Sequence, residues 1–116
     1  MRIKNVLILE EAMVDLEDGK CFYDEKEAGV GNYFWDSLLA DLESLVIYAG
    51  IHSKRFGFQR MLAKRFPYAI YYEIKEETAY VVAILPMRRN PAWIKGQLKE
   101  RNQQKIGRKG ARLNSC

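Results

Sequence analysis

The stretch YAIYYEIKEETAYVVAILP, residues 68–86, constrains the fold more than any other part of the chain. Its first half mixes aromatic and β-branched residues with polar ones, whereas YVVAIL in its second half carries no charged side chain. The charged run KEE separates the two halves. We therefore predict a β-hairpin with strands at 68–75 and 78–86. The second strand should be central in its sheet and buried on both faces.

Two further strands and two helices are predicted before the hairpin. RIKNVLIL at the start is short and rich in β-branched residues, and a third strand at about 58–65 ends before Pro67. Acidic residues from Glu10 onward suit the first turns of a helix. The second helix has the clearest periodicity in the chain, with an apolar stripe made of Phe34, Leu38, Leu42, Leu45 and Val46.

A last helix should begin at NPAWIKGQL, with Asn90 as its cap and Pro91 at its first position. The predicted order is β-α-α-β-β-β-α, an α+β fold in which a helical hairpin packs on a small, mainly antiparallel, four-stranded sheet. A chain of 116 residues suits one domain. We assign that domain to residues 1–100 and treat 101–116 as a basic, mobile tail.

The charge is divided unequally along the chain. Residues 1–50 carry four basic and eleven acidic side chains, whereas residues 51–94 carry eight basic and three acidic ones. The remaining residues carry seven basic side chains and one acidic side chain. A basic second half favours an anionic partner, either a nucleic acid or an acidic protein segment. Two solvated faces of a small domain are the simpler alternative.

Several classes of protein are disfavoured by what the sequence lacks. The apolar start is too short for a signal peptide, and the longest apolar run is less than half a membrane span. Cys21 and Cys116 lie far apart and match neither a disulfide framework nor a zinc spacing. We expect a cytoplasmic protein that does not enter a membrane and has no cofactor or metal.

Three segments together resemble the RelE/ParE superfamily, the toxins of bacterial type II toxin–antitoxin modules, also called plasmid stabilisation proteins. They are FPYAIYY (66–72), AYVVAIL (79–85) and RRNPAW (88–93), and the upstream region with its Gly-x-Gly resembles the family's helical hairpin. The resemblance covers about residues 3–98. It implies a small basic toxin that an acidic antitoxin holds inactive through protein–protein contacts.

The resemblance implies one of two targets. RelE-like members cut mRNA in the ribosomal A site, and ParE-like members poison DNA gyrase. Metal-free RNA cleavage needs groups that assist attack, stabilise the phosphate and protonate the leaving oxygen. The family's two arginines and one tyrosine for these tasks align with Ala69, Met87 and Trp93, none of which can replace them. Whether the chain is an enzyme is therefore left uncertain.

We accordingly predict a ParE-like toxin that acts by binding through a basic concave surface. A ribosome-dependent mRNA endonuclease with rearranged residues is one alternative, in which Arg88 or Arg89 takes over a catalytic role. A degenerate, non-toxic binding protein is another. The residues expected to bind the target or the antitoxin are Arg60, Lys64, Arg65, Tyr68, Arg88 and Arg89.

Simpler interpretations of the candidate residues stay open at this point. One arginine of the pair at 88–89 could form an ion pair with Asp36 or Asp41, while the other is only solvated. His52 is the only histidine, and a lone histidine is more often structural than catalytic. The basic tail could bind nucleic acid nonspecifically or serve only solubility.

Overall fold

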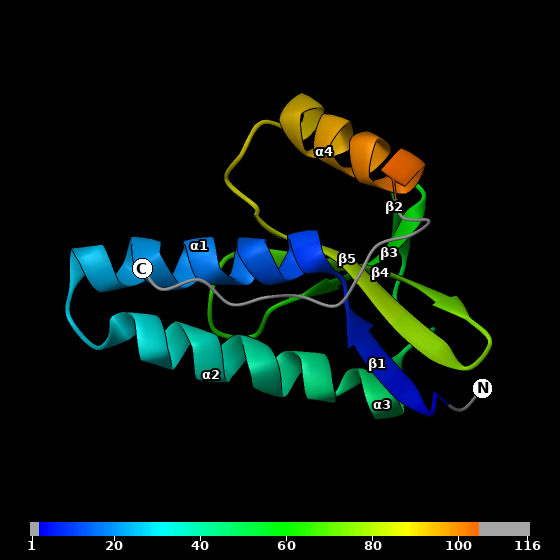
Figure 1. Cartoon of the computed structure of the whole chain (residues 1–116), viewed down its shortest axis with the longest axis horizontal. Coiled ribbons are helices and arrows are strands. Elements are labelled where there is room, and N and C mark those ends of the chain that lie inside the picture. The colour runs from blue at the N-terminus through cyan, green and yellow to red at the C-terminus, as the bar shows by residue number, and fades with distance from the viewer. Residues whose placement is uncertain (1–2, 105–116) are drawn as a thin grey trace.

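The computed structural model describes residues 3–104, which form a five-stranded sheet with helices on both faces (Figure 1). The strands are β1 (Asn5–Ile8), β2 (Lys54–Arg55), β3 (Phe58–Leu62), β4 (Tyr68–Lys75) and β5 (Thr78–Pro86). The helices are α1 (Glu10–Lys26), α2 (Val30–Glu43), α3 (Leu45–Tyr48) and α4 (Pro91–Gln104).

The sheet has the strand order β1-β5-β4-β3-β2. β1 runs parallel to β5, and every other neighbouring pair is antiparallel. β5 is therefore an inner strand, as its apolar sequence predicts. Its side chains are divided between two cores: Val81 and Ile84 pack toward α1 and α2, whereas Val82 and Leu85 pack toward α4.

The predicted element order is confirmed with two additions. β2 is an extra two-residue strand that pairs with β3, so the sheet has five strands and not four. α3 is an extra helical turn after α2. Val46 was predicted on the apolar stripe of the second helix, but α2 ends at Glu43 and Val46 is 46% exposed. After the turn at Ser44, Leu45 of the stripe is still buried in the core at the start of α3, whereas Val46 lies at the surface.

The α1–α2 hairpin is tight because two glycines allow the helices to approach closely. A Cβ on Gly31 would lie 2.5 Å from the Lys20 carbonyl oxygen, and one on Gly19 would lie 2.4 Å from the Phe34 ring. Asp24 fixes the link between the helices, because its Oδ1 accepts hydrogen bonds from the backbone N–H groups of Gly29 and Gly31. Within the Gly-x-Gly of the sequence, Gly31 therefore has a packing role, whereas Gly29 supplies a positive φ of 93° in the link.

α4 begins as predicted and continues further than predicted. Asn90 Oδ1 accepts a hydrogen bond from the Ala92 N–H at 2.7 Å, and Pro91 occupies the first helical position. The helix continues to Gln104, and the Arg101 side chain is buried, so the predicted domain boundary at 100/101 falls inside α4. The rest of the predicted tail, 105–116, lies outside the described residues.

Candidate functional site: a groove between α1 and α4

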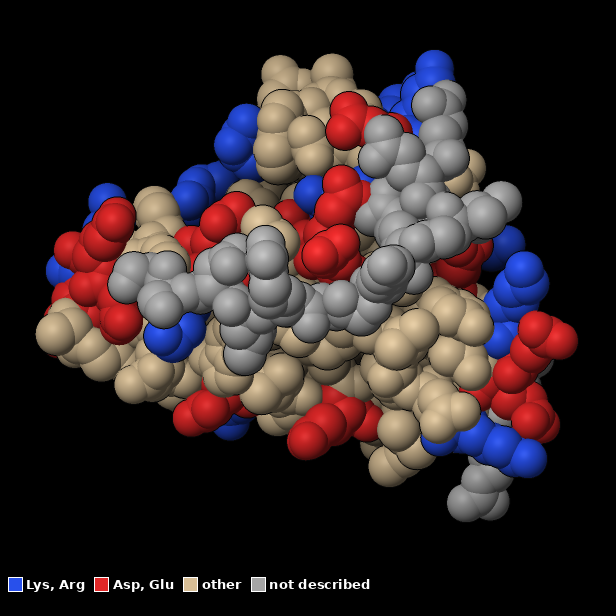
Figure 2. Space-filling view, viewed as in Figure 1, with Lys and Arg blue, Asp and Glu red and all other residues tan. Residues whose placement is uncertain are grey.

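A groove of about 420 Å³ lies between α1, the end of β5 and α4. We call it the α1–α4 groove. Its lining residues are Glu11, Val14, Asp15, Asp18, Gly19, Phe22, Tyr68, Ile84, Leu85, Pro86, Arg88, Arg89, Trp93, Gln97 and Arg101. The groove thus combines a cationic end with an acidic wall supplied by α1. Acidic side chains gather over α1 on the face shown in Figure 2.

The arginine pair lies at the cationic end, where a tight turn follows β5. The Met87 N–H donates to the Pro67 carbonyl at 2.9 Å, and the Arg89 N–H donates to the Pro86 carbonyl at 3.3 Å. This turn directs the two side chains to different walls. The Arg88 guanidinium carbon lies 4.6 Å from the Phe22 ring centroid on α1, and that of Arg89 lies 3.8 Å from the Trp93 ring on α4.

Each arginine is therefore held by an aromatic ring and not by an acid. Neither Arg88 nor Arg89 forms an ion pair within residues 3–104, so the expected pairing with Asp36 or Asp41 does not occur there. Asp41 instead accepts a hydrogen bond from the Lys64 backbone N–H at 3.1 Å. A cation over an aromatic face keeps its N–H donors accessible, because the attraction uses the face of the guanidinium. Both residues are exposed, so both can bind an anionic partner.

Tyr68 forms part of the groove floor. Its ring is 4% exposed and lies 4.9 Å from the Phe34 ring centroid. The pKa of Tyr68 is raised to about 12, mainly by burial and also by the neighbouring Tyr23, while Arg88 opposes the rise. The hydroxyl is therefore neutral at physiological pH and is a poor candidate for acid–base chemistry.

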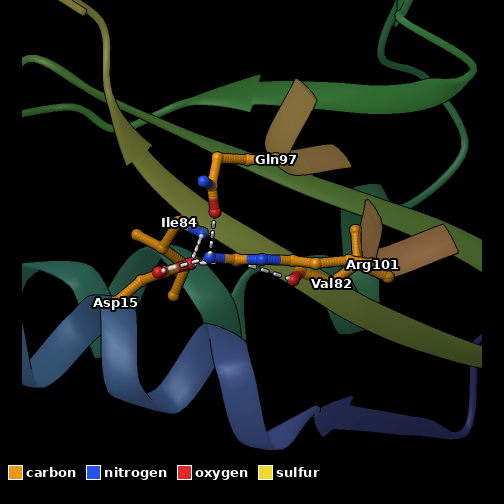
Figure 3. A network of polar contacts seen from close by, with 5 residues as sticks. All are labelled: Asp15, Val82, Ile84, Gln97 and Arg101. Carbon is orange, nitrogen blue, oxygen red and sulfur yellow. Dashed lines mark hydrogen bonds and ion pairs between the residues drawn. The ribbon is translucent and has the colours of Figure 1, made fainter. Parts of the chain in front are cut away.

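The opposite end of the groove is closed by a buried ion pair that links α4 to α1 across β5 (Figure 3). Arg101 binds Asp15 with both of its terminal nitrogens, and its Nη2 lies 2.9 Å from Asp15 Oδ1. The other bonds complete the network. Arg101 also donates to the Val82 carbonyl and to Gln97 Oε1, and Asp15 Oδ2 accepts the Ile84 N–H at 2.9 Å.

Burial raises the pKa of Asp15 above its ordinary value, and the Arg101 guanidinium and the Ile84 N–H oppose that rise. The ion pair thus has hydrogen-bond partners from α1, β5 and α4. Such a pair has a structural role, because its cation is already neutralised and is not offered to a ligand.

The structure brings three of the six predicted binding residues into the groove, namely Tyr68, Arg88 and Arg89. Arg60 lies elsewhere, on β3, paired with Tyr71 on the face of the sheet that α4 covers. Lys64 and Arg65 lie exposed in the connection between β3 and β4. These three residues do not line the groove.

The three positions aligned with nuclease residues occupy different environments. Ala69 is 1% exposed and packs in the core under α4, so it has no access to a ligand. Met87 is 42% exposed beside the groove. Trp93 lines the groove and supports Arg89.

His52 belongs to a separate polar network under the loop after α3. Its Nδ1 contacts the Tyr72 hydroxyl, which also accepts the Gly50 N–H at 3.0 Å and donates to Gln59 Oε1 at 3.2 Å. Burial lowers the pKa of His52. The network ties the loop to β3 and β4, which agrees with the structural interpretation of this histidine.

Sequence reasoning missed Phe22, Gln97 and the Asp15–Arg101 pair. Trp93, Gln97 and Arg101 are spaced four residues apart, which places them on one side of a helix. This spacing is visible in the sequence, but the predicted boundary at 100/101 placed Arg101 outside the helix. The partner Asp15 lies 86 positions away, and no local pattern connects the two residues.

Within residues 3–104, no cluster of three or more histidine, cysteine or acidic side chains is arranged to hold a metal ion. No helix of the described part of the chain has the length and apolar character needed to cross a membrane.

Comparison with known proteins identifies a class of fold. No family model and no curated protein matches the sequence. Among solved structures, the fold is similar to that of a toxin–antitoxin chain. The structure is titled "Chromosomal ParDE TA system from P. aeruginosa", and the match has a TM-score of 0.67 at 13% identity. It covers 74% of this chain and 98% of that chain. The α+β fold expected from the sequence resemblance is therefore confirmed.

Proposed function

We propose that this chain is the toxin component of a type II toxin–antitoxin system, ParE-like, and that it acts by binding a macromolecular target. The fold shared with a chain of a ParDE system supports this proposal. The observation that carries it is the pair Arg88 and Arg89, each stacked on an aromatic ring, exposed and without an acidic partner among the described residues.

The groove favours docking over catalysis. Arg88 and Arg89 point to opposite walls, and the one hydroxyl among the lining residues, on Tyr68, has its pKa raised to about 12 by burial. RNA cleavage needs a group that can exchange a proton near neutral pH beside the bound phosphate. Among the lining residues, the remaining titratable groups are acids of α1 and arginines. An acidic antitoxin segment fits the cationic end through carboxylate–guanidinium bonds, so neutralisation occurs by occlusion.

The test is inducible expression in a bacterium, with total RNA and plasmid supercoiling followed over the first minutes. We expect growth arrest with altered supercoiling or DNA breaks, and intact mRNA. Rapid mRNA cleavage that Arg88→Ala or Arg89→Ala abolishes would establish the endonuclease alternative instead. Unchanged growth at a high level of folded protein would identify a degenerate binding protein.

A charge-reversal pair separates docking from general electrostatics. Arg88→Glu/Arg89→Glu should abolish growth arrest and weaken binding of an acidic antitoxin. The matched control is Lys20→Glu/Lys75→Glu, which makes the same change in net charge at residues that do not line the groove. Equal losses in both variants would contradict a role for the groove.

A further inference from the structure

A second cavity lies on the other side of α4, between that helix and the turn from β2 to β3. It measures about 230 Å³, and we call it the Phe56 pocket. Its lining residues are Phe56, Phe58, Lys95, Leu98, Lys99 and Asn102. At 100° per residue, these α4 positions point away from Trp93, Gln97 and Arg101, which line the groove. The two sites are therefore separate.

The Phe56 pocket carries only positive charge among its lining residues. Lys95 and Lys99 are exposed and lie one turn apart, so their side chains are neighbours on one face of α4. Arg55 adds a third cation, because its guanidinium carbon lies 5.6 Å from the Phe56 ring centroid. Two acidic residues lie near these residues, Glu100 next to Lys99 in sequence and Glu73 on the strand that pairs with β3, but neither lines the pocket. This contrasts with the α1–α4 groove, where α1 contributes three carboxylates.

The floor of the pocket is aromatic. Phe58 is 4% exposed and belongs to the core under α4, whereas Phe56 is only partly buried. Phe56 has a φ of 56°, a conformation that a bulky residue rarely adopts. The next residue, Gly57, continues the turn with a φ of 87°. The turn thus holds one phenylalanine ring at the mouth of the pocket.

We propose that the Phe56 pocket binds single-stranded nucleic acid. One base stacks against the Phe56 ring, and the phosphates on either side of it bind Lys95 and Lys99. Aromatic rings beside cations form the usual platform for unpaired bases, because every base has a stacking face and every linkage has a phosphate. The cavity is smaller than the range for drug-sized ligands, so it accommodates one ring system and not a longer segment.

An acidic peptide fits the pocket less well than a nucleic acid does. A carboxylate is bound best by the planar fork of a guanidinium, and the residues that line the pocket include no arginine. Lysines bind phosphate as point charges without that geometry. The amide of Asn102 also offers a donor and an acceptor to the edge of a base.

The test measures binding of the full-length protein to a fluorescently labelled oligouridylate and to the matching oligothymidylate by anisotropy. Both should bind at 50 mM salt and weaken steeply toward 200 mM salt. Tighter binding of the oligouridylate would assign contacts to the 2′-hydroxyl. Polyglutamate serves as the competitor that represents an acidic peptide. If neither oligonucleotide binds at low salt, or if polyglutamate binds as tightly as they do, the proposal is overturned.

Two variants locate the binding. Phe56→Gly removes the ring at a position whose positive φ suits glycine, so the variant folds and should bind about tenfold more weakly. Lys95→Glu/Lys99→Glu should reduce the salt slope by at least about 1.4, the value for two lost phosphate contacts.

The matched control is Lys20→Glu/Lys26→Glu on α1, on the other face of the sheet, which should retain most of the binding. If basic residues elsewhere in the chain bound the oligonucleotide through charge alone, Phe56→Gly would not change the affinity. That result, or an equal loss in the control, would contradict the proposal.

Discussion

Arg101 and the Arg88–Arg89 pair border the same groove, but the charge of Arg101 is neutralised by a buried acid and the charges of the pair are not. Arg101 is 7% exposed and donates hydrogen bonds to Asp15 from both of its terminal nitrogens. Arg88 and Arg89 are exposed and rest on Phe22 and Trp93. A cation that is neutralised in the interior holds elements together. A cation that is only positioned by a ring keeps its hydrogen-bonding capacity for a partner.

The largest effect should come from breaking the buried pair. Arg101→Ala leaves Asp15 buried without its counterion and should lower the free energy of unfolding by about 3 to 5 kcal/mol. Urea denaturation measures this change. Replacing both partners by apolar residues, as in Asp15→Leu/Arg101→Met, should recover most of the loss. If Arg101→Ala costs no more than an exposed arginine does, the pair is not structural.

Unfolding at alkaline pH tests the burial of Tyr68 at the groove floor. Because the pKa of Tyr68 is about 12 in the folded protein and about 10 in an unfolded chain, folding favours its neutral form. Its contribution to stability is complete below about pH 10 and is lost as the pH rises toward 12, by about 2 to 3 kcal/mol. Tyr68→Phe should remove this part of the pH dependence. If the free energy of unfolding of the parent and of the variant changes in parallel between pH 9 and pH 12, Tyr68 does not contribute to the pH dependence.

The rings under the two arginines should contribute less to stability than to binding. Trp93→Leu keeps an apolar side chain but removes the face that supports Arg89, and should cost about 1 kcal/mol of stability or less. The same variant should weaken binding of an acidic partner, because Arg89 is then no longer held in place. Isothermal titration against an acidic peptide measures the second effect. Full affinity in Trp93→Leu would mean that the ring does not orient the guanidinium.

The sequence predicted the fold where the pattern is local. The hairpin at 68–86, the capped start of α4 and the central position of β5 follow from periodicity and turn residues, and the structure confirms them. The two-residue strand β2 is too short to leave a pattern. The register of α3 depends on the turn at Ser44, which no residue preference signals.

The candidate site was predicted only in part, for a different reason. The arginines at 88–89 stand out in the sequence because they follow an apolar strand. The ring under each one, on α1 and on α4, comes from a different element, and only the packing of the fold brings the three elements together. The acidic residues of α1 can be read from the sequence. The ion pair that one of them, Asp15, forms with Arg101 cannot, because the two residues lie far apart in the chain.

Loss of the exposed arginines should affect function without affecting stability. The most direct test is growth after induction of Arg88→Ala/Arg89→Ala, compared with the parent at matched levels of folded protein. We predict a variant within about 1 kcal/mol of the parent in stability that no longer arrests growth, since exposed side chains contribute little to folding. A double variant that arrests growth as fast as the parent would contradict the claim that these two arginines dock the target.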